Sequence, residues 1–201
     1  MTAPPLVSVV DDEPTIQQLF VQLGRLERLA VRTWTRGADF LAAFDESQPG
    51  CLVLDLNLPD MSGLQVLEQL AQRGSQIPVV FMSGLAKVSQ AVAALKLGSL
   101  DFVEKPFAID DMLAAIHRAL DSDRERRATN LQQHHLRERF AALTPRETEV
   151  MDLVVQGHAN KIVAATLGVS PKTVEVHRAN VMRKTGANSL AELVRLKIAV
   201  R

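Results

Sequence analysis

The stretch CLVLDLNLPD, residues 51–60, places an aspartate, Asp55, directly after four apolar residues. A short run rich in Val and Leu that leads into Asn, Pro and Gly predicts a central strand of a parallel sheet, followed by a loop. Asp55 then lies at the carboxyl end of that strand, where open α/β sheets bind their ligands. An aspartate that only begins a turn would give the same short pattern, so this stretch alone makes Asp55 a candidate and no more.

Length and composition indicate a folded chain of one large domain or two small ones. It has 201 residues, of which 47% are hydrophobic and 23% are charged. No apolar run is long enough to span a bilayer, and the first residues, MTAPPLVSVVDDE, do not look like a secretory signal. The single cysteine, Cys51, excludes an internal disulfide. We therefore expect a cytoplasmic protein in which Cys51 is a core residue.

The net charge of zero hides two halves of opposite charge. Residues 1–122 contain 9 basic and 15 acidic residues, a net charge of −6, whereas residues 123–201 contain 14 and 8, a net charge of +6. A basic module of this kind is what DNA binding requires, because neutralising phosphates supplies most of the sequence-independent affinity. A basic surface that faces solvent and binds no DNA would give the same count of charged residues.

The first half alternates between short apolar runs and segments with helical spacing. Helical spacing is found, for example, at Ile16, Leu19, Phe20 and Leu23, and again at Val88, Val92 and Leu95. This alternation predicts an α/β fold, a doubly wound, flavodoxin-like, five-stranded parallel sheet with helices on both faces. The predicted strands are residues 6–10, 30–34, 51–55, 78–82 and 100–105.

Polar side chains stand at the carboxyl ends of four of the five predicted strands. They are Asp11, Asp12, Asp55, Ser83 and Lys105. Because these ends meet at one edge of a parallel sheet, the three carboxylates would repel one another unless a cation lay among them. Oxygen ligands with room for water suit Mg²⁺. The lysine and the hydroxyl would complete a site for a phosphoryl group, to which Gly84 leaves access.

Four motifs of this half, VVDDE, LVLDLNLPDMSG, FMSG and DFVEKPF, resemble those of the receiver domain of two-component response regulators, in order and spacing, over residues 5–121. The resemblance implies that Asp55 accepts a phosphoryl group and that Lys105 pairs with it. It also implies that Ser83 is the switch hydroxyl, that Phe102 is the switch aromatic, and that the bond before Pro106 is cis.

The same resemblance implies a magnesium site. Asp12 would bind Mg²⁺ directly and Asp11 through water, with Asp55 and the backbone carbonyl of Asn57 as further ligands. Phosphorylation would then rearrange the surface around the last strand, and we expect dimer contacts on polar positions of residues 87–120, with Val88, Val92 and Leu95 mostly in the core.

Residues 121–139, DSDRERRATNLQQHHLRER, contain neither Gly nor Pro and few apolar residues. They are predicted to form either an exposed extension of the preceding helix or a flexible tether. We therefore divide the chain into a receiver domain at residues 1–122, a helical linker at 123–140 and a third part at 141–201.

The third part is predicted to form four short helices. Thr144 is an N-cap with Pro145 at the first helical position and Glu147 three residues after the cap, which is a capping box. Gly157 follows this helix, residues 160–167 form the second helix before Gly168, and Ser170 caps the third. Two helices joined by a three-residue turn with Gly are a helix-turn-helix layout.

The third of these helices has two different faces. At about 100° per residue, Val176, Ala179 and Arg183 lie near Lys172, while Val174 and Val181 lie on the opposite side. The small apolar residues on the basic face would let the helix approach base edges closely. The alternative interpretation is that this is an ordinary surface helix in a small bundle.

LTPRETEV and NKIVAATLGVSPKTVEVHRANVMRKTG resemble the LuxR-type helix-turn-helix domain over residues 142–200, with the recognition helix at 171–184. With the receiver, this resembles the FixJ subfamily of response regulators. We expect groove contacts from Lys172, Glu175, Val176 and Ala179, and phosphate contacts from Lys161, Thr173, Arg178 and Arg183. Glu175 either accepts from a cytosine amino group or faces away, and a structural hydrogen bond is as plausible for His177 as a DNA contact. We interpret the helix at 190–200 as a dimer contact on paired half-sites.

Three other classes fit the sequence less well. An aspartyl-phosphate phosphatase needs a second aspartate two residues after the nucleophile, where this chain has Asn57 and so lacks the general acid. A flavin-binding module needs a loop that cradles phosphate after the first strand, but DDEP is acidic there. A constitutive DNA binder with a degenerate receiver would have lost one of the site residues, all of which are present.

We therefore predict a DNA-binding response regulator, not an enzyme apart from its own phosphoryl transfer to and from Asp55. Its expected cofactor is Mg²⁺, and its expected partners are a sensor histidine kinase, double-stranded promoter DNA, a second copy of the chain and RNA polymerase. Phosphorylation would act either by promoting dimers or by relieving inhibition of the DNA-binding domain, and the commoner outcome in this subfamily is activation of transcription.

Overall fold

The computed structural model describes residues 4–84, 94 and 97–200. The chain forms two compact units, residues 1–126 and 127–201. Within the described residues, no helix is both long enough and apolar enough to cross a membrane.

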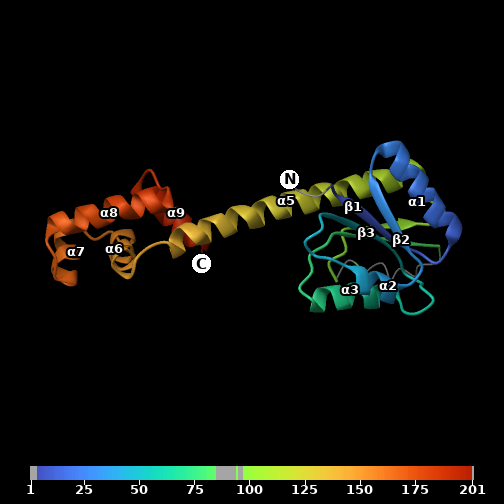
Figure 1. Ribbon diagram of the computed structural model, residues 1–201, viewed down its shortest axis with the longest axis horizontal. Helices are drawn as coiled ribbons and strands as arrows, with labels where there is room; N and C mark the ends of the chain where they lie inside the picture. The colour runs from blue at the N-terminus through green and yellow to red at the C-terminus, as the bar shows by residue number, and fades with distance from the viewer. Residues whose placement is uncertain (1–3, 85–93, 95–96, 201) are drawn as a thin grey trace. The chain divides into compact units, whose positions relative to one another are not determined.

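The first unit contains a five-stranded parallel sheet, as predicted (Figure 1). The strand order is β2-β1-β3-β4-β5, so the chain reverses its direction of winding between β1 and β3. This crossover places the ends of β1 and β3 side by side, at the kind of position where open α/β sheets bind ligands. The strands are β1 (Leu6–Val10), β2 (Ala30–Trp34), β3 (Gly50–Asp55), β4 (Val79–Ser83) and β5 (Asp101–Glu104).

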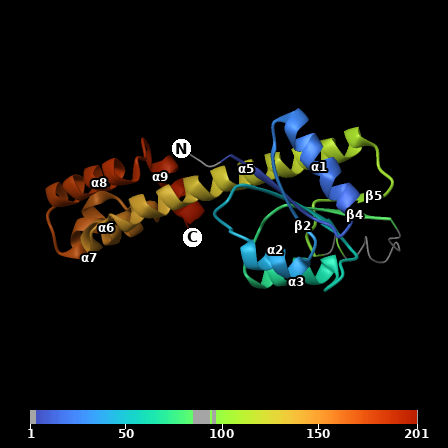
Figure 2. The same cartoon turned by 45° about the vertical axis from the view of Figure 1, so that its right-hand side comes forward.

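Helices cover both faces of this sheet, as Figures 1 and 2 show. Helices α1 (Pro14–Glu27) and α5 (Ile109–Ala141) pack on one face, where Phe20 and Ile116 are buried against the strands. Helices α2 (Gly37–Ala43) and α3 (Gly63–Gln72) pack on the other. The central strand β3 is buried along its whole length because both faces are covered. The predicted core positions Val88, Val92 and Leu95 lie outside the described residues.

Helix α5 is continuous for 33 residues and includes the whole segment 121–139. Of the two conformations predicted for that segment, the structure therefore has the helical extension. The buried residues of α5 end at Asp123, so the helix packs on the sheet up to that point. No break in secondary structure marks the boundary placed after residue 122, and the three-part division stays a prediction.

The second unit contains the four predicted helices α6 (Pro145–Val155), α7 (Asn160–Leu167), α8 (Pro171–Thr185) and α9 (Leu190–Val200). Thr144 and Glu147 form the predicted capping box at the start of α6. Ser170 caps α8, accepting a hydrogen bond from the Thr173 amide at 3.1 Å. Gly168 has a φ of 65°, which lets the chain turn from α7 into α8. The unit is therefore a helix-turn-helix with a further helix on each side.

Candidate functional site

Three aspartates meet at the carboxyl edge of the sheet. Asp11 follows β1 and Asp55 ends β3, and these strands are neighbours. Carboxylate oxygens of Asp11, Asp12 and Asp55 all lie within 4.8 Å of one another. Asp11 is fully buried and Asp55 nearly so, whereas Asp12 is exposed. The parallel arrangement of the strands thus brings Asp55 beside the adjacent pair Asp11 and Asp12, from which it is far apart in sequence.

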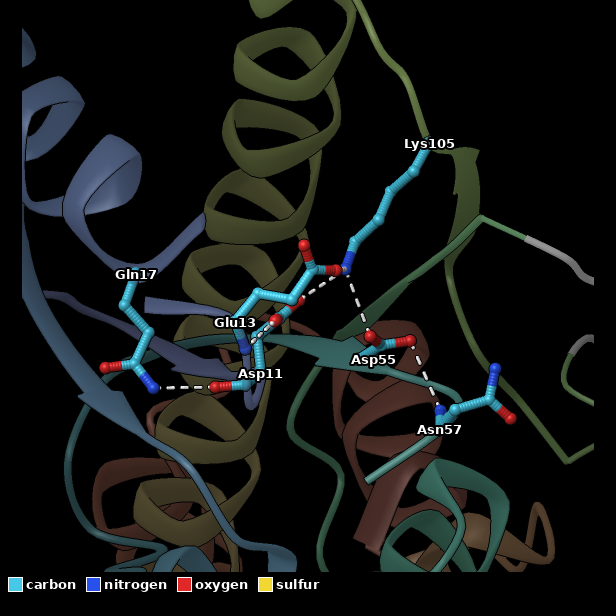
Figure 3. Close-up of polar contacts among 6 residues, drawn as sticks. All are labelled: Asp11, Glu13, Gln17, Asp55, Asn57 and Lys105. Carbon is cyan, nitrogen blue, oxygen red and sulfur yellow. Dashed lines mark hydrogen bonds and ion pairs between the residues drawn. The ribbon is translucent and has the colours of Figure 1, made fainter. Parts of the chain in front are cut away.

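Lys105, just after β5, supplies the positive charge that this cluster needs (Figure 3). Its Nζ lies 2.6 Å from Asp11 Oδ2, 3.0 Å from Asp55 Oδ2 and 3.1 Å from Glu13 Oε1. Burial lowers the Lys105 pKa, but the hydrogen bonds to these carboxylates outweigh burial, so the pKa is raised and the ammonium stays charged. Burial also raises the pKa of Asp11, an effect that the hydrogen bonds from Lys105 and the Glu13 amide offset only in part.

Backbone and side-chain hydrogen bonds hold the two main carboxylates in place. The Asn57 amide donates to Asp55 Oδ1 at 3.2 Å, and the Glu13 amide donates to Asp11 Oδ1 at 2.8 Å. Gln17, on α1, donates through Nε2 to the Asp11 carbonyl at 2.6 Å (Figure 3). Each carboxylate therefore keeps its position through a local contact as well as through Lys105.

A cleft of about 770 Å³ opens over the cluster. Asp12, Asp55, Asn57 and Lys105 line its polar part. Among the described residues, an added Cβ at Gly84 would meet only the Lys105 Cβ, at 3.8 Å, so this position leaves the cleft open, as expected. A small charged group can reach Asp55 from solvent.

Ser83 and Phe102 lie on neighbouring strands next to the cluster. Ser83 is the last residue of β4, and its buried Oγ has no hydrogen-bond partner among the described residues. Phe102, on β5, is partly buried against the core on the α2 and α3 face. A buried hydroxyl without a partner is costly, so Ser83 is suited to bind an oxygen that arrives with a ligand. The Lys105–Pro106 bond is cis, as expected.

The donor set fits a hard divalent cation. Three carboxylates from two adjacent strand ends provide oxygen ligands close enough to share one ion, and Mg²⁺ is bound by carboxylates together with water. We expect Asp11, Asp12, Asp55 and the Asn57 carbonyl to hold it. A bound Mg²⁺ would compensate negative charge at this site.

The second candidate site is the surface of α8. Val174 and Val181 are buried, while Lys172, Glu175, Val176, Ala179 and Arg183 are exposed, which confirms the two faces predicted for this helix. Lys161, on α7, is exposed as well. The side chains expected in a DNA groove are therefore accessible on the surface of the second unit.

Three residues that are expected to contact DNA form hydrogen bonds or an ion pair with other residues of the chain. Arg178 Nη1 donates to Asn160 Oδ1 at 2.6 Å, which joins α8 to the start of α7. Thr173 is hydrogen-bonded to the Ser170 cap, with 2.8 Å between the hydroxyl oxygens. Glu175 Oε2 lies 3.2 Å from Lys172 Nζ, so its carboxylate pairs with a neighbouring base-contact candidate. His177 Nδ1 is buried without a partner among the described residues, so no structural hydrogen bond is found at that nitrogen.

Two family models match the chain. Residues 7–117 match the response regulator receiver domain, and residues 141–197 match the bacterial regulatory proteins of the luxR family. The transcriptional regulatory protein FixJ of Azorhizobium caulinodans is 41% identical over 192 residues, which cover 96% of this chain and 91% of the relative. The chain is a response regulator of the FixJ subfamily.

Solved structures of other response regulators share its architecture. StyR is 38% identical and aligns with a TM-score of 0.90, over 98% of this response regulator and 99% of the StyR chain. Full-length FixJ from B. japonicum is 35% identical and aligns with a TM-score of 0.61, over 99% and 98% of the two chains. This response regulator is therefore a transcription regulator with a receiver and a LuxR-type DNA-binding domain.

Two residues of the receiver site were not predicted. Glu13 was noted only as part of a strand-end motif, but it is a third carboxylate on Lys105. Gln17 was not singled out, because a glutamine on a helix surface carries no pattern that points to the Asp11 carbonyl. Glu13 was the easier to find, since it directly follows the aspartate pair.

Proposed function

We propose that a partner sensor histidine kinase phosphorylates Asp55, with Mg²⁺ as cofactor, and that phosphorylation promotes dimerisation and promoter binding. The observation that carries this proposal is the position of Lys105 Nζ, 3.0 Å from Asp55 Oδ2 and 2.6 Å from Asp11 Oδ2. A carboxylate at the mouth of an open cleft can attack a phosphoryl group, and the partly buried cation beside it can stabilise the product.

In the proposed reaction an oxygen of Asp55 attacks the phosphorus of a phosphohistidine on the kinase. The new P–O bond forms as the P–N bond breaks, and the imidazole nitrogen keeps the electron pair of that bond. The Lys105 ammonium offsets the charge on the phosphoryl oxygens as it develops. Mg²⁺ bound at Asp11, Asp12, Asp55 and the Asn57 carbonyl would add further charge compensation.

The acyl phosphate supplies acceptor oxygens where Ser83 has a buried hydroxyl without a partner among the described residues. We infer that the Ser83 hydroxyl donates to a phosphoryl oxygen and that Phe102 then turns into the space that Ser83 leaves. The surface formed around β5 and α5 changes as a result. Dimer contacts would lie on polar positions of residues 87–120, part of which falls outside the described residues.

The DNA-binding unit would place α8 in the major groove. Lys172, Val176 and Ala179 are exposed on the face that would meet base edges, and Lys161 and Arg183 are exposed where they can reach phosphates. Paired half-sites and contact with RNA polymerase would make the bound dimer an activator of transcription.

The test compares the wild-type chain with Asp55→Asn after incubation with a small phosphodonor and Mg²⁺. Intact mass and oligomeric state are measured on the same samples. A phosphoryl adduct confined to the wild type, together with a shift to dimer, is the expected result. An adduct without dimers would favour relief of inhibition instead, and no adduct under any condition would overturn the proposal.

A further inference from the structure

The last turn of the long helix α5 and the last turn of the recognition helix α8 bind each other through reciprocal hydrogen bonds. Arg139 Nη1, on α5, donates to the Thr185 carbonyl of α8 at 3.2 Å. Lys184 Nζ, on α8, donates to the carbonyl of Ala142, just beyond α5, at 3.1 Å. We call these four residues, 139, 142, 184 and 185, the C-terminal clasp.

The clasp provides hydrogen-bond donors to backbone carbonyls that have no partner within a helix. The last carbonyls of a helix have no partner within it and carry the negative end of the helix dipole. Arg139 binds such a carbonyl at the end of α8, and Lys184 binds the carbonyl of the residue that follows α5. Lys184 also donates to Glu147 Oε2 at 2.7 Å, which connects the clasp to the start of α6.

The position of Arg139 depends on a glycine at the end of α8. Gly186 has a φ of 74°, and its amide donates to the Met182 carbonyl at 2.9 Å. A Cβ at Gly186 would lie 2.8 Å from Arg139 Nη1, so the guanidinium fills space that only glycine leaves. Beside it, Phe140 packs in the core cluster that contains Val181 of α8. The end of α5 therefore packs as part of the DNA-binding unit.

The clasp is at the far end of α8 from the expected base contacts. Lys172 and Val176 lie in the first half of the helix, and Thr185 is its last residue. With a rise of about 1.5 Å per residue, Lys172 and Thr185 are about 20 Å apart along the axis, so a tilt of only ~5° at the clasp would move the other end by about 2 Å. A shift of that size is enough to break hydrogen bonds to base edges.

We propose that Arg139 is a positioning residue for DNA recognition, which orients the recognition helix α8 from the linker helix α5 without contacting DNA. This inference rests on the DNA-binding half of the proposed function. It gives the linker a role in how the recognition helix is held, beyond joining two domains.

The first experiment measures binding of the phosphodonor-treated full chain to duplexes selected from a random-sequence pool, as a function of salt. Arg139→Ala is compared with Arg137→Ala, which removes the same charge from the same helix but outside the clasp. We expect Arg139→Ala to weaken binding about three- to tenfold with an unchanged salt slope, because no phosphate contact is lost. Arg137→Ala should bind as the wild type does.

Two results would overturn the inference. Unchanged affinity in Arg139→Ala would mean that the clasp does not position α8. If the slope of log affinity against log salt concentration became smaller in magnitude by about one in Arg139→Ala, Arg139 would contact a phosphate directly. If the wild type bound no duplex at all, the proposed DNA-binding function would fail, which is a different outcome from an unaffected Arg139→Ala variant.

A second experiment needs no DNA. Amide hydrogen exchange at residues 182–187 of the full chain should become faster in Arg139→Ala and stay unchanged in Arg137→Ala. Arg139→Lys, which can still donate one hydrogen bond to the Thr185 carbonyl, should restore most of the protection and of the affinity. Unchanged exchange in Arg139→Ala would contradict the clasp itself.

Discussion

Asp123 Oδ2, on α5, accepts a hydrogen bond from the Gly50 amide at 2.9 Å. Gly50 is the first residue of β3 and Asp55 is the last, so the strand that carries the proposed phosphoacceptor is bound to α5 at its opposite end. The Asp123 side chain is only 3% exposed and also pairs with Arg126. At Gly50 an added Cβ would lie 1.9 Å from the Leu6 carbonyl oxygen, so no other residue fits there without movement of the backbone.

Asp123→Ala should destabilise the receiver unit by about 2–4 kcal/mol, because the buried Gly50 amide loses its acceptor and Arg126 loses one of its ion-pair partners. Trp34, the single tryptophan, lies on β2 and reports on this unit alone, so its fluorescence in a urea titration measures the effect. Asp121→Ala is the matched control, since that side chain is 59% exposed on the same helix. Equal unfolding midpoints for the two variants would contradict the role of Asp123.

Lys105→Ala should slow phosphoryl-adduct formation by about 100-fold, since it removes the partly buried cation that offsets negative charge beside Asp55. Glu13→Gln should keep most of the rate, because the contacts of Lys105 to Asp11 and Asp55 remain. Initial rates from intact-mass spectra with a small phosphodonor and Mg²⁺ provide the comparison. A Glu13→Gln rate as low as that of Lys105→Ala would place Glu13 in the reaction itself.

The second unit should lose stability in acid through Glu147. A hydrogen bond from Lys184 and another from the Thr144 amide lower the pKa of Glu147 from 4.5 to about 2. Because the pKa is lower in the folded state, the folded state binds fewer protons between these values. The contribution is therefore fully present above pH 4.5 and is lost as the pH falls toward 2.

The check on this prediction is the difference in unfolding temperature between the wild type and Glu147→Gln, measured by calorimetry across this range. We expect a large difference near neutral pH that shrinks as the pH falls through the window. A difference that does not depend on pH would show that the carboxylate charge of Glu147 is not what stabilises the unit.

Glu175→Ala should strengthen binding to non-specific duplex DNA several-fold, because it removes a negative charge that lies 3.2 Å from Lys172 Nζ on the exposed face of α8. Glu192→Ala, on α9, removes one negative charge from a different helix of the same unit and serves as the control. The measurement is affinity for a random-sequence duplex as a function of salt. If Glu175 instead accepts from a cytosine amino group, the variant would relax selection for cytosine at one position of the enriched sequence.

Much of the receiver site could be predicted from the sequence because its signals are local. A strand with two buried faces reads as a continuous apolar run, and a polar residue after it marks the carboxyl end, which is how Asp11, Asp55 and Ser83 were found. The same holds for the caps at Thr144 and Ser170, where donor and acceptor are three residues apart. These interactions depend only on neighbours along the chain.

Which elements form, and which residues stand at their ends, can be predicted from the sequence, since both depend on periodicity and on short-range hydrogen bonds. Which of these ends bind each other is known from the folded arrangement alone. Asp123 meets Gly50 across 73 positions, and Arg139 meets Thr185 across 46. The sequence near one residue of such a pair does not indicate which residue is its partner, because the pairing depends on how distant elements pack. On another surface the same side chains would only face solvent.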